Sequence, residues 1–231
     1  MSPLTYHGEL PTMSLITNTF LRAFYQGVNP QNEHSAVTFW AYVFKVYFPE
    51  EHFLFDTQKP ASHSDPLRRV DGKLTYVENQ TNRLMVLFFF EAKRTSQAQA
   101  EMQAVEGQAF EACGTFLSSQ PHLSHIYAVT TIGTEARVWK YSADRTFLGL
   151  GNSSPSGTRA AYIDADSAAA STLRSALLHM KQFPPSSYAT AATITSQTAS
   201  QAPQTTAWTW SVPHRNYYRY KNGVLEWAPK K

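Results

Sequence analysis

Cysteine is almost missing from this chain: Cys113 is the one cysteine among 231 residues. A single cysteine excludes an intramolecular disulfide and a zinc site built from several cysteine ligands. The eight histidines are scattered, without the His-x-x-x-His spacing that puts two metal ligands on one helix face. The sequence therefore offers neither a disulfide framework nor a cysteine-based metal site.

Long apolar runs and glycine-rich catalytic loops are also missing. No apolar run reaches the ~20 residues that a membrane-spanning helix needs, and the first 14 residues lack the layout of a secretory signal. A Gly-x-Ser-x-Gly elbow is absent, and Gly149-Leu-Gly151 lacks the third glycine of a dinucleotide loop. We expect an intracellular protein without a membrane partner; nucleus and cytoplasm both remain open.

Net charge is small. The 20 Lys and Arg residues exceed the 17 Asp and Glu residues by three, and the isoelectric point is about 8.9. This mild basic excess fits a nucleic-acid partner but does not establish one. A hydrophobic fraction of 42% with 13% aromatic residues indicates a folded core.

Apolar spacing predicts an α/β domain around one mixed sheet. Residues 58–69, with two prolines and two serines, read as a loop. Continuous apolar residues at 84–90 are typical of a central strand that is buried on both faces. The predicted helices are 13–25, 32–47 (with Asn32 as its cap), 97–117 and 167–183; the predicted strands are 53–55, 70–77, 84–90, 126–132, 136–141 and 162–163.

The composition predicts three segments: a domain over 1–183, a flexible Ser/Thr/Pro/Gln linker over 184–206, and an aromatic tail over 207–231. In the tail, Asn222-Gly223 between two aromatic runs predicts a β-hairpin. An isolated hairpin is marginal in water, so we expect it to pack on the domain or on a second subunit. Stacking of its tyrosines on a single nucleic-acid strand is the alternative.

Charged residues stand beside the apolar strands in an informative pattern. Asp71 lies at the start of the strand predicted at 70–77, and Glu91 ends the run at 84–90, with Lys93 two residues beyond. Period-two alternation puts Glu91 and Lys93 on one face, and an antiparallel hairpin would bring Asp71 beside Glu91. Buried charges need a partner or a metal, and carboxylate oxygens suit Mg²⁺ or Mn²⁺.

Arg69-Val-Asp71 and Glu91-Ala-Lys93 together resemble the motif of the PD-(D/E)XK nucleases. The resemblance covers roughly residues 32–141 and extends to uncharacterised fungal members; the proline that precedes the motif's Asp is Val70 here. It implies a restriction-endonuclease-like fold and an Mg²⁺- or Mn²⁺-dependent endo- or exonuclease that acts on DNA rather than RNA. Asp71 and Glu91 would bind the metal, and Lys93 would be the catalytic base or stabilise the phosphate.

The resemblance implies further site residues. Glu33, near the start of the helix before the sheet, would support the metal, and Gln108 on the following helix would lie over the site. Basic residues near the motif would bind backbone phosphates: Arg68, Arg69, Lys73 and Arg94.

Each assignment has a plainer alternative. Glu91 and Lys93 can be a solvated ion pair, Asp71-Gly72 a turn, Glu33 a charge at a helix terminus, and Gln108 a surface residue. The fold itself can serve binding, or small-molecule acid/base chemistry with the same carboxylates and lysine. Whether the protein is a monomer or a homodimer stays open.

Overall fold

The computed structural model divides the chain into two units, Met1–Pro185 and Ser186–Lys231, each of which is described by itself. The structure describes residues 14–49, 51–62, 65–78, 82–185, 209–211, 216–221 and 224–227. For 58–62, 65–69 and the three C-terminal segments, it describes the backbone alone.

The first unit is built on one mixed sheet of seven strands, as the apolar pattern predicted. Its strands follow the order β1-β2-β3-β4-β5-β6, and β7 pairs with β5. The β3–β4 pair is parallel, because α3 crosses over between them, and the other pairs are antiparallel. The strands are β1 (Phe53–Ser62), β2 (Asp65–Glu78), β3 (Arg83–Lys93), β4 (His125–Ile132), β5 (Glu135–Ser142), β6 (Phe147–Gly149) and β7 (Ile163–Asp164).

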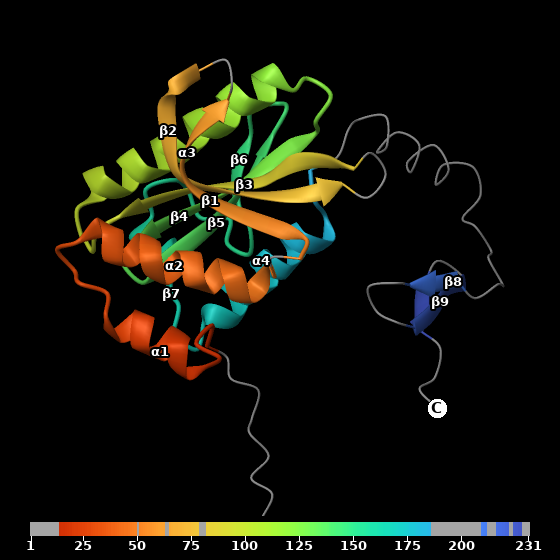
Figure 1. Ribbon diagram of the computed structural model, residues 1–231, viewed down its shortest axis with the longest axis horizontal. Coiled ribbons are helices and arrows are strands. Elements are labelled where there is room, and N and C mark those ends of the chain that lie inside the picture. The colour runs from red at the N-terminus through yellow and green to blue at the C-terminus, as the bar shows by residue number, and fades with distance from the viewer. Residues whose placement is uncertain are drawn as a thin grey trace, which may run out of the picture. The chain divides into compact units, whose positions relative to one another are not determined.

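Helices cover both faces of this sheet. Figure 1 shows α3 on one face, and α1, α2 and α4 on the other. Asn18 and Asn32 cap α1 and α2 through their side-chain oxygens. Among the helices described, none is long and apolar enough to span a membrane. The helices are α1 (Thr19–Gln26), α2 (Glu33–Tyr47), α3 (Gln99–Ser119) and α4 (Ala170–Gln182), with a 3₁₀ turn at Arg159–Ala161.

Alternate residues of β3 serve two different cores. On the α2 face, the Phe44 ring lies 4.9 Å from Phe88 and 5.2 Å from Phe90, centroid to centroid. On the α3 face, Phe89 packs with Cys113, which is fully buried; burial raises the pKa of the Cys113 thiol, and the Glu91 charge adds to the shift. The continuous apolar run in β3 is explained by this burial on both faces.

Several predicted boundaries were wrong. The expected loop at 58–69 belongs to strands β1 and β2, which extend far beyond the predicted cores. Pro60 is tolerated there because β1 is an edge strand, which has a partner on one side alone. Asp71 therefore lies inside β2 rather than at its start. The helix predicted from residue 13 begins at Thr19, and β6 was not predicted.

The second unit contains a three-stranded antiparallel sheet in the order β10-β9-β8. Its strands are β8 (Thr209–Ser211), β9 (Asn216–Lys221) and β10 (Val224–Trp227). The predicted turn at 222–223, the predicted linker from residue 186 onward and all side chains of these strands lie outside the described residues. The packing of the aromatic tail therefore stays a prediction.

Candidate active site

Asp71 and Glu91 lie on the neighbouring strands β2 and β3. The paired residues of the two strands end at Gly72 and Phe90, which directly adjoin Asp71 and Glu91 in sequence. The Asp71 Oδ2 atom accepts a hydrogen bond from the main-chain nitrogen of Ala92 at 2.8 Å, and the Glu91 residue is 5% exposed. Asp71 is thus bonded to β3 at the residue that follows Glu91.

Lys93 brings a cation to the end of β3. Its Nζ donates to the Ala92 carbonyl oxygen at 3.0 Å and lies 3.7 Å from Oε2 of Glu33, the first residue of α2. The Lys93 side chain is 23% exposed, so the ammonium is reachable from solvent. Glu33 therefore joins the site as the partner of Lys93, and its predicted role toward a metal stays a prediction.

The row of polar residues continues across the sheet beyond Glu91. Glu91 pairs with Thr130 on β4, and Thr130 pairs with Arg137 on β5. Arg137 is 2% exposed, and its Cζ atom lies 3.8 Å from the centroid of the Trp139 ring. Its Nη1 atom forms an ion pair with Oε1 of Glu106 on α3 at 3.4 Å. Sequence reasoning missed this buried pair, which lies on the α3 face together with Glu91.

Glu106 and Arg137 together fasten the segment after β6. Glu106 Oε2 accepts hydrogen bonds from the Gly157 nitrogen, at 2.6 Å, and from the Ser156 hydroxyl. Arg137 donates to the carbonyl oxygens of Ser154 and of residue 155. Burial lowers the pKa of the Arg137 guanidinium, and the nearby Glu106 charge opposes that shift. Buried charges of this kind persist when an opposite charge and hydrogen bonds compensate them.

Tyr162 and Thr130 close the network beside Glu91. The Thr130 hydroxyl accepts a hydrogen bond from Trp139 Nε1 at 2.9 Å and shares another, also 2.9 Å, with the Tyr162 hydroxyl. Burial raises the pKa of Tyr162, and the Glu106 charge raises it further, so the phenol stays neutral. A buried polar network therefore supports β4, the strand next to Glu91.

Three ion pairs surround the end of the sheet where β3 stops. Their members are partly exposed, unlike Glu106 and Arg137. The Glu101 carboxyl has a lowered pKa because Ser96 donates a hydrogen bond to it and Arg94 lies near. The pairs are Lys93 with Glu33, Arg94 with Glu101, and Arg159 with Glu135.

The remaining predicted site residues lie on α3 and β2. Gln108 is exposed on α3, two residues after Glu106, and side chains two apart on a helix do not point the same way. Lys73 pairs with Phe89 of β3 and, being two residues from Asp71, is on the same face as that carboxylate. Arg68 and Arg69 belong to β2, but their side chains lie outside the described residues.

Metal ligands are sparse in the described segments: no three His, Cys, Asp or Glu side chains converge there as a metal site. Asp71 and Glu91 are a pair rather than a group of three. The carboxylate oxygens of these two residues are the donors that a divalent cation would use at this point.

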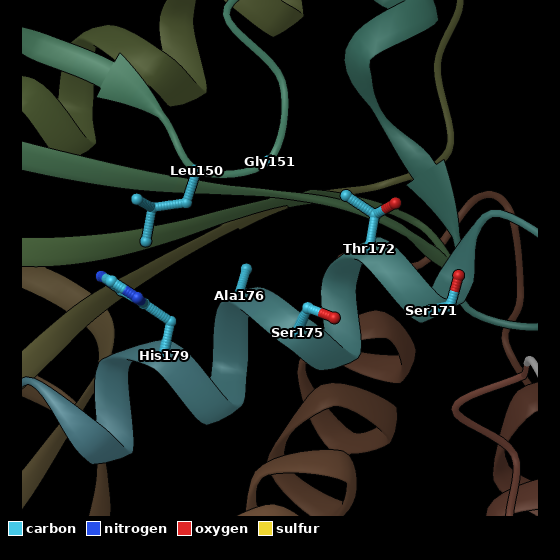
Figure 2. A pocket seen from close by; sticks show the side chains of 7 residues that line it. All are labelled: Leu150, Gly151, Ser171, Thr172, Ser175, Ala176 and His179. Atoms are coloured by element: carbon cyan, nitrogen blue, oxygen red, sulfur yellow. The ribbon is translucent and has the colours of Figure 1, made fainter. Parts of the chain in front are cut away.

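The pocket in Figure 2 lies elsewhere, between α4 and the segment after β6. Its volume is about 380 Å³. Burial and the Lys140 charge lower the pKa of its His179. No carboxylate lines it, so it does not compete with Asp71 and Glu91 as a place for metal chemistry. It is lined by Leu150, Gly151, Ser171, Thr172, Ser175, Ala176 and His179.

Comparison with known proteins gave no relative: no family model, no curated protein and no solved structure matches this chain. What the site can do must therefore follow from its own residues.

Proposed function

We propose that this protein hydrolyses phosphodiester bonds of nucleic acid, preferably DNA, with the help of Mg²⁺ or Mn²⁺. The observation that supports this most directly is at the end of β3: Ala92, which stands between Glu91 and Lys93, donates its main-chain N–H to Asp71 and accepts from the Lys93 ammonium. Two acidic oxygen donors beside a cation form a set that can hold a divalent ion and a phosphate together.

The element order supports the same proposal. The elements α2, β1, β2, β3, α3 and β4 follow one another, with Asp71 on β2 and the Glu91-Ala92-Lys93 tripeptide at the end of β3. This order resembles the restriction-endonuclease-like fold of the PD-(D/E)XK nucleases, and we propose that fold for the first unit.

The donor set fits magnesium better than zinc. Mg²⁺ keeps several waters and is commonly bound through one or two carboxylates plus substrate phosphate oxygens. Asp71 and Glu91 supply two carboxylates, whereas structural and catalytic zinc sites need three or four nitrogen, sulfur or oxygen ligands. When bound, the divalent ion would activate a water and offset negative charge on the phosphate.

The chain's own residues have distinct roles in this proposal. Asp71 fixes the main chain at Ala92 and so orients the Glu91 carboxylate beside it. The contacts of Lys93, a carbonyl oxygen and the Glu33 carboxylate, are those of a charged ammonium. Lys93 would therefore offset the negative charge of the phosphate. In the reaction, the water oxygen bonds to phosphorus, the bond from phosphorus to one ester oxygen breaks, and that ester oxygen takes up a proton.

The test is a cleavage assay of the full chain on plasmid and single-stranded DNA, with Mg²⁺, Mn²⁺ or chelator. We expect metal-dependent cleavage that Glu91→Gln and Lys93→Ala each abolish while thermal melting stays cooperative. Glu51→Gln is the matched control, because Glu51 is an exposed carboxylate outside the site. Full activity in Lys93→Ala would remove Lys93 from the mechanism, and absence of cleavage with either metal would reject the proposal.

A binding role without cleavage is the second candidate. It is favoured by the small net charge of +3 and by the lack of three converging ligands in the described part of the chain. Small-molecule acid/base chemistry by the same carboxylates and lysine belongs to this candidate too. Calorimetric titration with Mg²⁺ and Mn²⁺ separates the two candidates. A metal-dependent nuclease binds the metal and loses this binding in Glu91→Gln, whereas a binding module shows no metal binding that depends on Glu91.

A further inference from the structure

We propose that Arg159 is a second phosphate-binding residue, masked by Glu135 until a nucleic-acid strand displaces that carboxylate. The strand would run from Lys93 across the ends of β4 and β5 to Arg159. This inference rests on the proposed function, because it assigns the path of the same substrate.

Strand register connects Lys93 with Arg159. Lys93 pairs with Ile132 on β4, and Ile132 pairs with Glu135 on β5, so the backbones of the three form one row at this end of the sheet, while the Lys93 ammonium reaches Glu33 of α2. Glu135 holds Arg159 in an ion pair. The Arg159 Nε atom also donates to Gln97, four residues beyond Lys93, at 3.4 Å. Arg159 therefore belongs to the same end of the sheet as the proposed site.

The spacing along this row suits a nucleic-acid backbone. Neighbouring strands are ~4.8 Å apart, so two steps from β3 to β5 span about 10 Å. The rise of ~3.4 Å per nucleotide is measured along the helix axis. Consecutive phosphates of one strand also wind around that axis and are farther apart, so this span corresponds to about one or two nucleotides. A phosphate held by Lys93 would place another phosphate, about one or two nucleotides away, near Arg159.

The Arg159–Glu135 pair is of the kind that a phosphate can displace. The Arg159 and Glu135 side chains are 25% and 28% exposed, so solvent reaches the pair. Guanidinium binds phosphate and carboxylate in the same two-pronged geometry. By contrast, Arg137 and Glu106 are 2% and 1% exposed, so that pair is closed to substrate and serves structure. The two arginines thus differ in role although both pair with a glutamate.

Binding of the full chain to fluorescent duplex and single-stranded DNA, in chelator and over a series of salt concentrations, tests Arg159 separately from cleavage. We expect Arg159→Ala to weaken binding and to reduce the slope of log affinity against log salt by about 0.9 for duplex or 0.7 for single strands. Glu135→Gln should strengthen binding, because it unmasks Arg159. Arg83→Ala is the control: it removes an exposed arginine at the opposite end of β3 and should change the slope less.

Arg159→Lys is the control for a folding defect in Arg159→Ala, because it keeps the positive charge and should keep the slope of log affinity against log salt. An unchanged slope in Arg159→Ala, or one that changes as much as in Arg83→Ala, overturns the inference. Weaker binding in Glu135→Gln overturns the masking role, and no binding of DNA by the full chain overturns the whole inference.

Cleavage of oligonucleotides extended one nucleotide at a time on either side separates this inference from the proposed function. We expect KM to fall at about one or two added nucleotides on one side, and this step to vanish in Arg159→Ala with kcat unchanged. Cleavage without that step rejects the role of Arg159 alone. Arg159-dependent binding without any cleavage rejects the nuclease and retains the binding surface.

Discussion

At the scale of single residues, the buried pair of Glu106 and Arg137 gives the sharpest stability prediction. We expect Arg137→Met to destabilise the fold by about 3–5 kcal/mol, because it leaves the Glu106 carboxylate buried without its cation. The double variant Glu106→Gln with Arg137→Met should recover part of this loss, since no uncompensated charge remains. Urea unfolding of both variants measures the two values.

Arg174→Met is the matched control, because Arg174 is exposed on α4 and should cost less than about 0.5 kcal/mol. A double variant that is no more stable than Arg137→Met would mean that the pair acts through contacts to the 154–157 segment rather than through charge compensation.

His125 gives a pH prediction. Burial, together with the Lys140 charge, lowers the pKa of His125 from 6.5 to about 4 in the folded chain. The neutral imidazole is therefore favoured by folding, and its stabilisation is complete above pH 6.5. As the pH falls from 6.5 toward 4, the unfolded chain takes up a proton that the folded chain refuses, and the free energy of unfolding decreases.

Urea unfolding at several pH values measures this effect. In His125→Gln, the decline between pH 6.5 and 4 should be shallower, whereas His122→Gln, which changes an exposed histidine, should retain it. Equal slopes in the wild type and His125→Gln would show that other groups, such as the neighbouring His179, carry the dependence.

The sequence alone identified the candidate site residues Glu91 and Lys93, but it did not identify the buried pair of Glu106 and Arg137. Glu91 and Lys93 were visible because charges follow an apolar run, a contrast that the sequence displays directly. Glu106 and Arg137 were not singled out, although each stands at an inward position between apolar neighbours: Glu106 follows Val105 on α3, and Arg137 alternates with Trp139 on β5. Their partner could not be read from the sequence, because the contact joins a helix and a strand 31 residues apart.

At the scale of elements, the hairpin of β1 and β2 depends on Gly72. A Cβ atom at Gly72 would lie 2.5 Å from Cζ of Phe55, whose ring packs against Phe44 and Phe90. We expect Gly72→Ala to cost about 1–3 kcal/mol through overpacking and to impair metal-dependent cleavage, because Asp71 is adjacent. Phe55→Leu should restore part of the stability in the double variant.

Gly107→Ala is the matched control on α3, where a Cβ would meet no heavy atom within 4 Å. Alanine there should stabilise the helix by about 0.5–1 kcal/mol, because glycine is a poor helix former. Thermal melting and urea unfolding distinguish the two substitutions, and a Gly72→Ala protein as stable as the wild type would contradict the predicted crowding.

Sequence patterns located the central elements better than the edges. The helix at 33–47 and the strand at 84–90 were predicted well, because a cap and a long apolar run mark them. The extensions of β1 and β2 were not, because an edge strand exposes much of its surface and carries polar residues and Pro60 without the alternation of a core strand. Pairing partners such as β3 with β4 follow from tertiary packing and are not written in local sequence.

At the scale of the whole molecule, the first unit has an apolar core of its own. Its described side chains form three apolar clusters, and the Tyr76 hydroxyl donates to the carbonyl oxygen of Pro185 at 2.9 Å. A truncation after residue 185 therefore keeps the last contact of the unit, whereas one before residue 184 would remove it. We expect residues 1–185 to fold cooperatively.

The truncated chain should nevertheless melt at a lower temperature than the full chain. After residue 207 the sequence carries three tryptophans and several tyrosines, an apolar content that we expect to pack on the first unit or on a second subunit. A loss of ~1–2 kcal/mol would lower the Tm by roughly 2–8 °C in a protein of this size. Calorimetry at two protein concentrations measures the shift, and a shift that depends on concentration indicates the second subunit. An unchanged Tm with reduced affinity for DNA would instead make the tail a nucleic-acid-binding appendage, and the packing prediction would be wrong.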